Sequence, residues 1–383
     1  MTKSPYIFPF ILLFTVFFLS LLSPVHNNVL LKNIFLALRV ILNTTIIALA
    51  IDHRRKESMD KLFAFVLILP LIFALYKFHA TRYFDYFLLI SSVYIFCTLK
   101  AEELCFIVKR TTQIYFVLLL LLCILTFFQI NPIAEITGPT LRRRLSVGFW
   151  NTNISGYFYT MIVGGSILLG TPSRIKVFKI LFLGLFLYVI TDTRVLLIGV
   201  ILWVFYSLIS VYRLRKTVQK VLYVFTFIIT CILAIYPFML HFLFSIRLKG
   251  IDLDIILSRR LIIAQKTMGS FNLLSYLTGN MTIPAMDSFS INLLSNAGLF
   301  VYLLFFYRTL SRIHMHQKRV KIIVFMLLFL AVGIFESNTS STNFISIIFY
   351  SLLLKDDFYL LFEEQGKTKF ICKSNIKYSI IKA

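Results

Sequence analysis

Charged residues are scarce in this sequence, and acidic residues are the scarcest. Only 14% of the 383 residues are charged, with 16 Asp and Glu against 39 Lys and Arg, whereas 59% are hydrophobic. A soluble domain carries about 25% charged residues. Together with a mean hydropathy of +0.88, this scarcity excludes a water-soluble domain of any size. The sequence therefore predicts one integral membrane domain covering residues 1–383.

Several motifs of enzymes and transporters are also missing. The five cysteines form no CxxC pair and no metal-ligand spacing, which argues against disulfides and zinc. There is no P-loop, HExxH motif, nucleophile elbow or internal repeat. No pair of matching Gly- or Pro-broken spans marks a secondary transporter. We therefore expect no metal and no other cofactor.

Long apolar runs predict an all-α fold, a polytopic bundle of about twelve transmembrane helices. Runs such as 7–22, 62–76 and 221–240 contain no charged residue and are long enough, or nearly so, to cross a bilayer. Helices are expected because each satisfies its own backbone hydrogen bonds in lipid. The predicted spans lie near 7–24, 29–51, 62–78, 84–99, 113–130, 155–170, 177–190, 194–212, 221–240, 290–307, 320–335 and 343–360. The first run lacks a cleavage pattern and is predicted to remain as a signal anchor.

Basic residues orient this bundle, because Lys and Arg are retained in the cytoplasm. The rich segments all fall on one predicted side: 54–61, 100–110, 174–176, 213–220, 308–321 and the tail after Lys355. Both termini, with the tail at about 361–383, are therefore predicted to be cytoplasmic. The net charge of +23 lies in short loops beside spans. This distribution indicates attraction to membrane lipid and no binding of nucleic acid.

Two longer loops, about 131–154 and 241–289, are predicted to lie outside and to break the charge rule. Their basic residues are Arg142, Arg143, Arg144, Arg247, Lys249, Arg259, Arg260 and Lys266. Arg194 stands at the predicted outer start of span eight. Guanidinium groups donate paired, charge-assisted hydrogen bonds to phosphate. The outer side is therefore expected to bind an anion.

Near the first loop, each motif has a structural interpretation beside the functional one. Asn151 and Asn153 suit sugar hydroxyls or a helix cap, and Gly148 and Gly156 would let the backbone approach a ligand. Arg194 suits phosphate or a clasp with Asp192. We place Arg39, inside span two, outside the site.

The second loop and the end of span eleven supply two candidate carboxylates. Asp287 is either a general base or a helix cap or arginine partner. Glu336 is either a second candidate base or part of an ordinary turn, and the seven polar residues after it suit a hydroxyl-binding or helix-capping turn. Leu257, Leu261 and Ala264 recur at helical spacing and predict a short amphipathic helix that presents Arg259 or Arg260.

Taken in order, these elements resemble the bacterial O-antigen polymerase and ligase superfamily. The elements are Arg144-Leu145-Ser146 with Asn151-x-Asn153, Thr191-Asp192-Thr193-Arg194, Arg259-Arg260, and Asp287 followed after ten residues by Gly298. The full length resembles the O-antigen polymerases, with about a dozen spans and two arginine-rich periplasmic loops. The ligase branch has His where this chain has Asp287, and this difference favours a polymerase.

The resemblance implies an inverting transfer at the periplasmic face of the bacterial inner membrane, in lipopolysaccharide O-antigen synthesis. Oligosaccharide repeat units would pass from undecaprenyl pyrophosphate to another lipid-linked unit, without metal or nucleotide sugar. Arg194, Arg260 and Arg144 would bind pyrophosphate, with Arg143 and Arg259 beside them. Asp287 would be the catalytic base, and Asn151, Asn153 and Glu336 would contact substrate.

Two other functions stay open beside the polymerase. One is an O-antigen ligase that joins polymer to the lipid A core, and the other is a flippase or transporter of lipid-linked oligosaccharide. Cationic residues gathered on one face disfavour a flippase, which usually places them in a central cavity. The resemblance also implies a separate chain-length regulator as a protein partner.

Overall fold

The computed structural model is almost entirely helical over the residues that it describes. These residues are 5–53, 89–90, 92–128, 145–149, 151–170, 172–212, 215–239, 247–248, 251–252, 260–269, 271–279, 288–334, 343–360 and 362. Within them, the strands are β1 (Arg247–Leu248) and β2 (Ile251–Asp252), which pair antiparallel. The all-α expectation is thus confirmed for this part of the chain.

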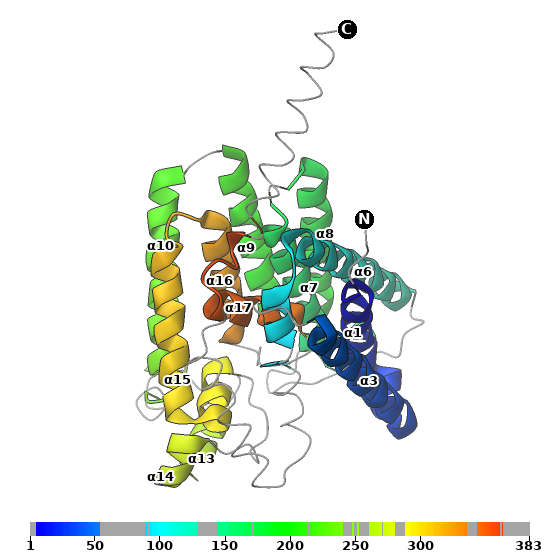
Figure 1. The fold of residues 1–383 in the computed structure, drawn as a ribbon. Helices are drawn as coiled ribbons and strands as arrows, with labels where there is room; N and C mark the ends of the chain where they lie inside the picture. The colour runs from blue at the N-terminus through cyan, green and yellow to red at the C-terminus, as the bar shows by residue number, and fades with distance from the viewer. Residues whose placement is uncertain are drawn as a thin grey trace.

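The helices form a bundle in which many long axes are roughly aligned, while the helices at 29–53 and 101–127 run obliquely (Figure 1). They are α1 (Ile7–Ser20), α2 (Ser23–Asn27), α3 (Val29–His53), α6 (Ala101–Phe127), α7 (Thr152–Leu168), α8 (Arg174–Thr191), α9 (Arg194–Tyr212), α10 (Arg215–Ile235), α13 (Arg260–Gly269), α14 (Leu273–Thr278), α15 (Phe289–Met315), α16 (Val320–Gly333) and α17 (Phe344–Leu354). In the described part, α3, α6, α10 and α15 are long and apolar enough to cross a membrane, by length and composition. Shorter apolar helices include α1, α9, α16 and α17.

Most of the predicted spans coincide with a helix. The span at 62–78 lies outside the described residues, and the span at 84–99 is described from residue 89, with residue 91 left out, and is helical to Thr98. Each of the other ten overlaps α1, α3, α6 to α10 or α15 to α17. The number of crossings, twelve, stays a prediction.

Four basic segments that were predicted as loops are helical instead, wholly or in part. α6 begins at Ala101, α8 at Arg174 and α10 at Arg215, and α15 continues to Met315. At the start of α6, the Glu103 carboxylate accepts a hydrogen bond from the Lys100 backbone N–H at 3.0 Å. This bond satisfies a donor at the helix end, and the acidic first turn stabilises the helix dipole. The loop prediction for 100–110 was wrong because Lys, Arg and Glu are good helix formers.

α7 lies inside the bundle and contacts α6, α8, α9, α16 and α17. Glycine makes this central position possible. A Cβ at Gly164 would lie 2.6 Å from Ile345, and one at Gly165 would lie 2.2 Å from the Thr112 hydroxyl. Small residues let membrane helices approach closely, and van der Waals contact then stabilises the pair.

α15 is broken at Gly298, which has φ +79° and ψ 168°. The Phe289 ring centroid lies 5.2 Å from that of Phe305. In a straight helix these residues would be about 24 Å apart along the axis. Residues 289–297 therefore fold back against the helix that follows, and the prediction of one continuous span at 290–307 was wrong.

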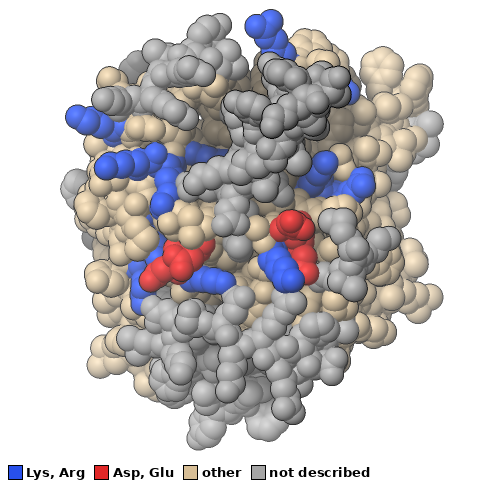
Figure 2. Space-filling model, turned by 45° about the horizontal axis from the view of Figure 1, so that its top comes forward, with Lys and Arg blue, Asp and Glu red and all other residues tan. Residues whose placement is uncertain are grey.

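The helices alternate in direction, and the bundle has two ends. At one end, the Arg194 end, α7, α9 and α17 begin and α8 finishes: Leu145 N–H donates to Ile190 O at 3.3 Å, and Asn343 Nδ2 donates to Tyr157 Oη. At the other, the Arg312 end, Lys355 Nζ donates to Cys97 O at 2.8 Å. The Arg312 end is the top of Figure 1, and Figure 2 turns it forward. Basic side chains are spread over this face, with acidic side chains in small groups between them. The alternation of helix directions agrees with the predicted assignment of the loops to two sides of the membrane. Which end of the bundle faces the cytoplasm stays a prediction.

Candidate functional site

The turn between α8 and α9 carries Arg194, the predicted pyrophosphate ligand that is best described. Asp192 ends α8 in the left-handed conformation, with φ +47° and ψ +43°, which reverses the chain within two residues. The buried Thr191 hydroxyl donates to Leu187 O at 2.8 Å and lies 3.2 Å from the Thr193 hydroxyl. Arg194 then opens α9 with an exposed side chain. Its two interpretations, phosphate ligand and clasp with Asp192, both stay predictions.

Residues 145–149 are held against this turn and against the junction of α1 and α2. Leu145 N–H donates to Ile190 O at 3.3 Å, and Gly148 O accepts from Ser23 N–H at 2.9 Å. Val147 and Gly148 have φ of +52° and +80°, so the backbone makes a tight left-handed turn. In the sequence, Leu145 directly follows Arg144. The first of the two longer loops therefore ends beside the turn that carries Arg194.

The start of α7 confirms the capping interpretation of Asn151. Its Oδ1 accepts a hydrogen bond from Asn153 N–H at 2.9 Å, so that oxygen already serves the helix. Asn153 lies half-buried in the first turn of α7. A Cβ at Gly156 would lie 3.0 Å from the Thr193 hydroxyl, so this glycine lets α7 and α9 meet. The structure thus brings Asn151, Asn153 and Arg194 to one end of the bundle.

Asn343 caps α17 at the same end. Its Oδ1 accepts from Ile345 N–H at 2.9 Å. Its Nδ2 donates to Tyr157 Oη and to Ser346 Oγ, the latter at 3.0 Å. Asn343 is the last residue of the polar run after Glu336, for which a helix-capping turn was one interpretation. For Asn343 that interpretation is confirmed.

The second of the two longer loops contains the predicted short helix, which is α13. Arg260 is its first residue, and its side chain lies outside the described residues. Tyr276 Oη of α14 donates to Met268 O of α13 at 3.2 Å. α14 in turn meets the break in α15, because a Cβ at Gly298 would lie 2.3 Å from Leu277 O. The helix that carries Arg260 is thereby linked to the folded-back part of α15 (Figure 1).

Residues 288–297 present a buried polar set that the sequence interpretation missed. The set comprises Ser288, Ser290, Asn292, Ser295 and Asn296, all at most 4% exposed. Asn296 Nδ2 donates to Asn292 Oδ1 at 2.7 Å, and the Ser288 and Ser290 hydroxyls lie 3.3 Å apart. Asn296 Oδ1 has no hydrogen-bond partner among the described residues. The available signal was five Ser and Asn residues within nine positions of an otherwise apolar stretch.

The remaining predicted site residues lie outside the described residues. They are Arg143, Arg144, Arg259, Asp287 and Glu336. Asp287 directly precedes the buried Ser288, from which the folded-back helix starts. Among the described residues, no cluster of three His, Cys, Asp or Glu side chains is arranged to hold a metal ion.

Protein-family models, curated proteins and solved structures were compared with this chain, and none of them matches.

Proposed function

We propose that this chain is an O-antigen polymerase, a metal-independent membrane glycosyltransferase that inverts the anomeric centre. Its substrates would be undecaprenyl-pyrophosphate-linked oligosaccharide units, joined at the periplasmic face of the bacterial inner membrane. One observation carries the proposal: Leu145 N–H is bonded to Ile190 O at 3.3 Å. This bond supports a site in which Arg143 and Arg144 approach Arg194 from the neighbouring loop.

In the proposed reaction, arginines do the work that a metal ion does in other glycosyltransferases. Arg144, Arg194 and Arg260 hold the donor pyrophosphate, and each charge-assisted bond contributes about 1.5–3 kcal/mol when shielded from water. α7 and α9 both begin at the Arg194 end. The partial positive charges of their N-termini favour the same anion. Fixed positive groups stabilise the charge that grows on the leaving pyrophosphate.

The bond changes are those of a single displacement. A hydroxyl of the acceptor sugar attacks the anomeric carbon of the donor, and the bond from that carbon to the pyrophosphate oxygen breaks. Asp287 takes the hydroxyl proton as general base. The Ser and Asn side chains of 288–296, with Asn153 and Glu336, are proposed to contact sugar hydroxyls.

The topology completes the proposal. Twelve spans would place the Arg194 end in the periplasm and both termini in the cytoplasm, with the basic Arg312 end beside anionic lipid. A separate chain-length regulator is the proposed protein partner.

The test compares two arginines that each open a helix, Arg194 of α9 and Arg174 of α8, both with exposed side chains. Arg194→Ala should collapse the lipopolysaccharide ladder to a single repeat at unchanged protein level, because the pyrophosphate loses a ligand. Arg194→Lys should restore part of the ladder, since a point charge lacks the guanidinium fork. Arg174→Ala should leave the ladder intact.

A full ladder from Arg194→Ala would contradict the proposed site. A deletion strain separates the other functions. Single-repeat lipopolysaccharide supports a polymerase, accumulated lipid-linked polymer indicates a ligase, and units trapped in the inner leaflet indicate a flippase.

A further inference from the structure

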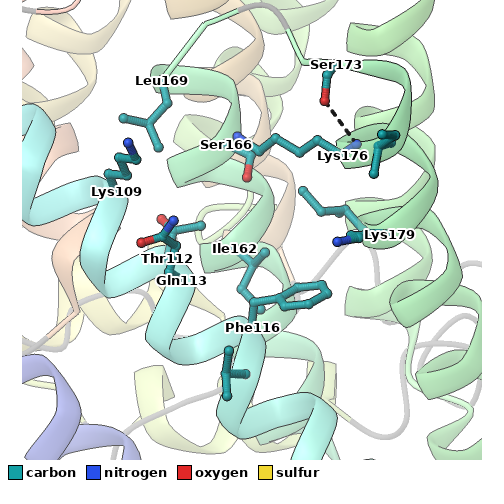
Figure 3. Close-up of a pocket in the computed structure, with 13 residues that line it drawn as sticks. Lys109, Thr112, Gln113, Phe116, Ile162, Ser166, Leu169, Ser173, Lys176 and Lys179 are labelled. Atoms are coloured by element: carbon teal, nitrogen blue, oxygen red, sulfur yellow. Dashed lines mark hydrogen bonds between the residues drawn. The ribbon is translucent and has the colours of Figure 1, made fainter.

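A cleft lies between α6 and α8 in the half of the bundle near the Arg312 end. Its volume is about 770 Å³, and α7 forms its floor. The polar residues that line it include Lys109 and Thr112 of α6, Ser166 of α7, and Lys176 and Lys179 of α8 (Figure 3). This cleft lies in the opposite half of the bundle from Arg194 and serves no step of the proposed transfer.

The charge in this cleft has one sign. Three lysines line it, and none of the described residues that line it carries a carboxylate. Lys176, just before the predicted span 177–190, extends across the cleft in the direction of Ser166 (Figure 3). Burial lowers the pKa of Lys176, and the positive charge of Lys109 lowers it further. An anion between the two ammonium groups would offset both effects.

Buried hydroxyl groups point to the same kind of ligand. Ser166 is 0% exposed and Thr112 is 6% exposed, and both line the cleft. Neither hydroxyl has a hydrogen-bond partner within the part of the chain that the structure describes. α8 also begins here, with Ser173 as its N-cap. A phosphate oxygen would accept from the Ser166 hydroxyl and from the first N–H groups of α8.

Farther along the same two helices lies an apolar pocket of about 240 Å³. Its lining includes Ile124 and Phe127 of α6 and Phe182 and Phe186 of α8, and has no polar surface. From Lys176 to Phe186, α8 rises about 15 Å, which equals the hydrocarbon depth of about one leaflet. The α6–α8 groove, meaning the cleft and this pocket together, is thus cationic at one end and apolar along one leaflet depth.

We propose that the α6–α8 groove binds one anionic phospholipid, with its phosphate at Lys109, Lys176 and Lys179 and one acyl chain along Phe182 and Phe186. A neutral phospholipid lacks the net charge that the three lysines favour. A free phosphate would leave the apolar pocket unfilled. This binding depends on the membrane location of the chain and is independent of the proposed glycosyl transfer.

Native mass spectrometry of the purified full chain in detergent tests this proposal with phosphatidylglycerol and phosphatidylcholine as probes. The wild type should bind a first phosphatidylglycerol more tightly than phosphatidylcholine. The variant Lys176→Gln with Lys179→Gln should weaken phosphatidylglycerol binding about 30-fold, from the loss of two charges near a headgroup. The control Lys220→Gln with Lys318→Gln removes two exposed charges outside the groove. This control should change the affinity by less than about twofold, because its lysines do not contact the proposed headgroup.

A second variant separates shape from charge and covers the case in which the lysine variant does not fold. Val117 lines the cleft and is 61% exposed, so Val117→Trp should fill the groove without disturbing the core. It should weaken phosphatidylglycerol binding while Lys109, Lys176 and Lys179 are retained. Equal binding of the two lipids, equal losses in the groove and control variants, or full binding by Val117→Trp would overturn the proposal. Displacement of the lipid by an equal concentration of inorganic phosphate would assign the site to free phosphate instead.

Discussion

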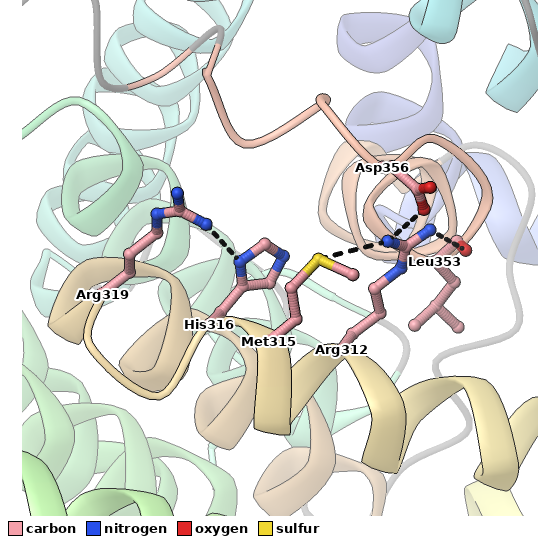
Figure 4. A network of polar contacts seen from close by, with 6 residues as sticks. All are labelled: Arg312, Met315, His316, Arg319, Leu353 and Asp356. Carbon is pink, nitrogen blue, oxygen red and sulfur yellow. Dashed lines mark hydrogen bonds and ion pairs between the residues drawn. The ribbon is translucent and has the colours of Figure 1, made fainter.

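At the scale of single residues, Arg312 is notable because its charged side chain is buried. It is 1% exposed, and its guanidinium pairs with Asp356 and donates to Leu353 O at 3.0 Å (Figure 4). These contacts join the end of α15 to the last turn of α17 and to the segment after it. The Asp356 side chain is 72% exposed, so water screens the ion pair on that side.

This asymmetry predicts an order of stabilities. Asp356→Ala removes the negative charge that pairs with a buried guanidinium, whereas Arg312→Met leaves an exposed carboxylate that water solvates. We expect Asp356→Ala to lower the free energy of unfolding by about 1–3 kcal/mol and Arg312→Met by less. Thermal unfolding in detergent measures both. A larger loss for Arg312→Met would show that the bond to Leu353 O dominates.

His316, in the turn after α15, predicts a pH dependence of stability. Its Nδ1 lies 2.9 Å from a guanidinium nitrogen of Arg319. The pKa of His316 is lowered from 6.5 to about 4, mainly by burial and also by the positive charges of Arg319 and Arg312, while Asp356 opposes this shift. The folded state therefore holds His316 neutral, while the unfolded state binds a proton below pH 6.5.

The stability that neutral His316 contributes is complete above about pH 6.5 and is lost as the pH falls toward 4. At most about 3 kcal/mol is involved. His316→Asn should therefore flatten the change in melting temperature between these two pH values. An unchanged slope in His316→Asn would assign the pH dependence to other groups.

At the scale of elements, the close contact of α14 with the break in α15 depends on two glycines. Gly279 and Gly298 both have φ of +79°, and a Cβ on either would lie 2.3 Å from a carbonyl oxygen of the other segment. Gly170 also has positive φ, +103°, but no atom lies within 4 Å of its Cβ position. Comparing an alanine substitution at Gly298 with one at Gly170 therefore separates the effect of crowding from that of backbone strain.

Gly170→Ala should cost about 1–2 kcal/mol, from the left-handed backbone alone. Gly298→Ala should cost more, by about 1–3 kcal/mol, because α14 must move away from α15. Thermal unfolding of the two variants in detergent measures the difference. Equal losses would mean that the contact between α14 and α15 contributes nothing to stability.

Hydropathy predicted where helices lie but not how α15 is built. Apolar runs located ten helices, and helical spacing located α13. The break at Gly298 was missed because hydropathy contains no information on φ and ψ, and because the apolar residues around the buried Ser and Asn side chains keep the mean hydropathy of the run high. The start of α6 was missed because charge was equated with loop, although Glu103 satisfies the Lys100 N–H.

The candidate site was predictable only in part, for the same kind of reason. The Asn151 cap and the short helix that begins at Arg260 follow from local sequence. The bond from Leu145 to Ile190 joins segments that are distant in the chain, and no local pattern encodes it. The roles of Asp287 and Glu336 stay predictions, because both lie outside the described residues.

At the scale of the whole molecule, function depends on which compartment the Arg194 end faces. Lipid-linked pyrophosphate can meet Arg194 in the proposed reaction only if this end is periplasmic. The Arg312 end, with its lysines and arginines, should then face the cytoplasm. Lys266 of α13 and Gln317 of the turn between α15 and α16 are exposed and mark the two ends.

Cysteine labelling of intact cells tests this arrangement most directly, in a chain whose five native cysteines have been replaced. With a membrane-impermeant maleimide, Lys266→Cys should be labelled in intact cells, and Gln317→Cys only after the inner membrane is permeabilised. The reverse pattern would place the Arg194 end in the cytoplasm and contradict the proposed function.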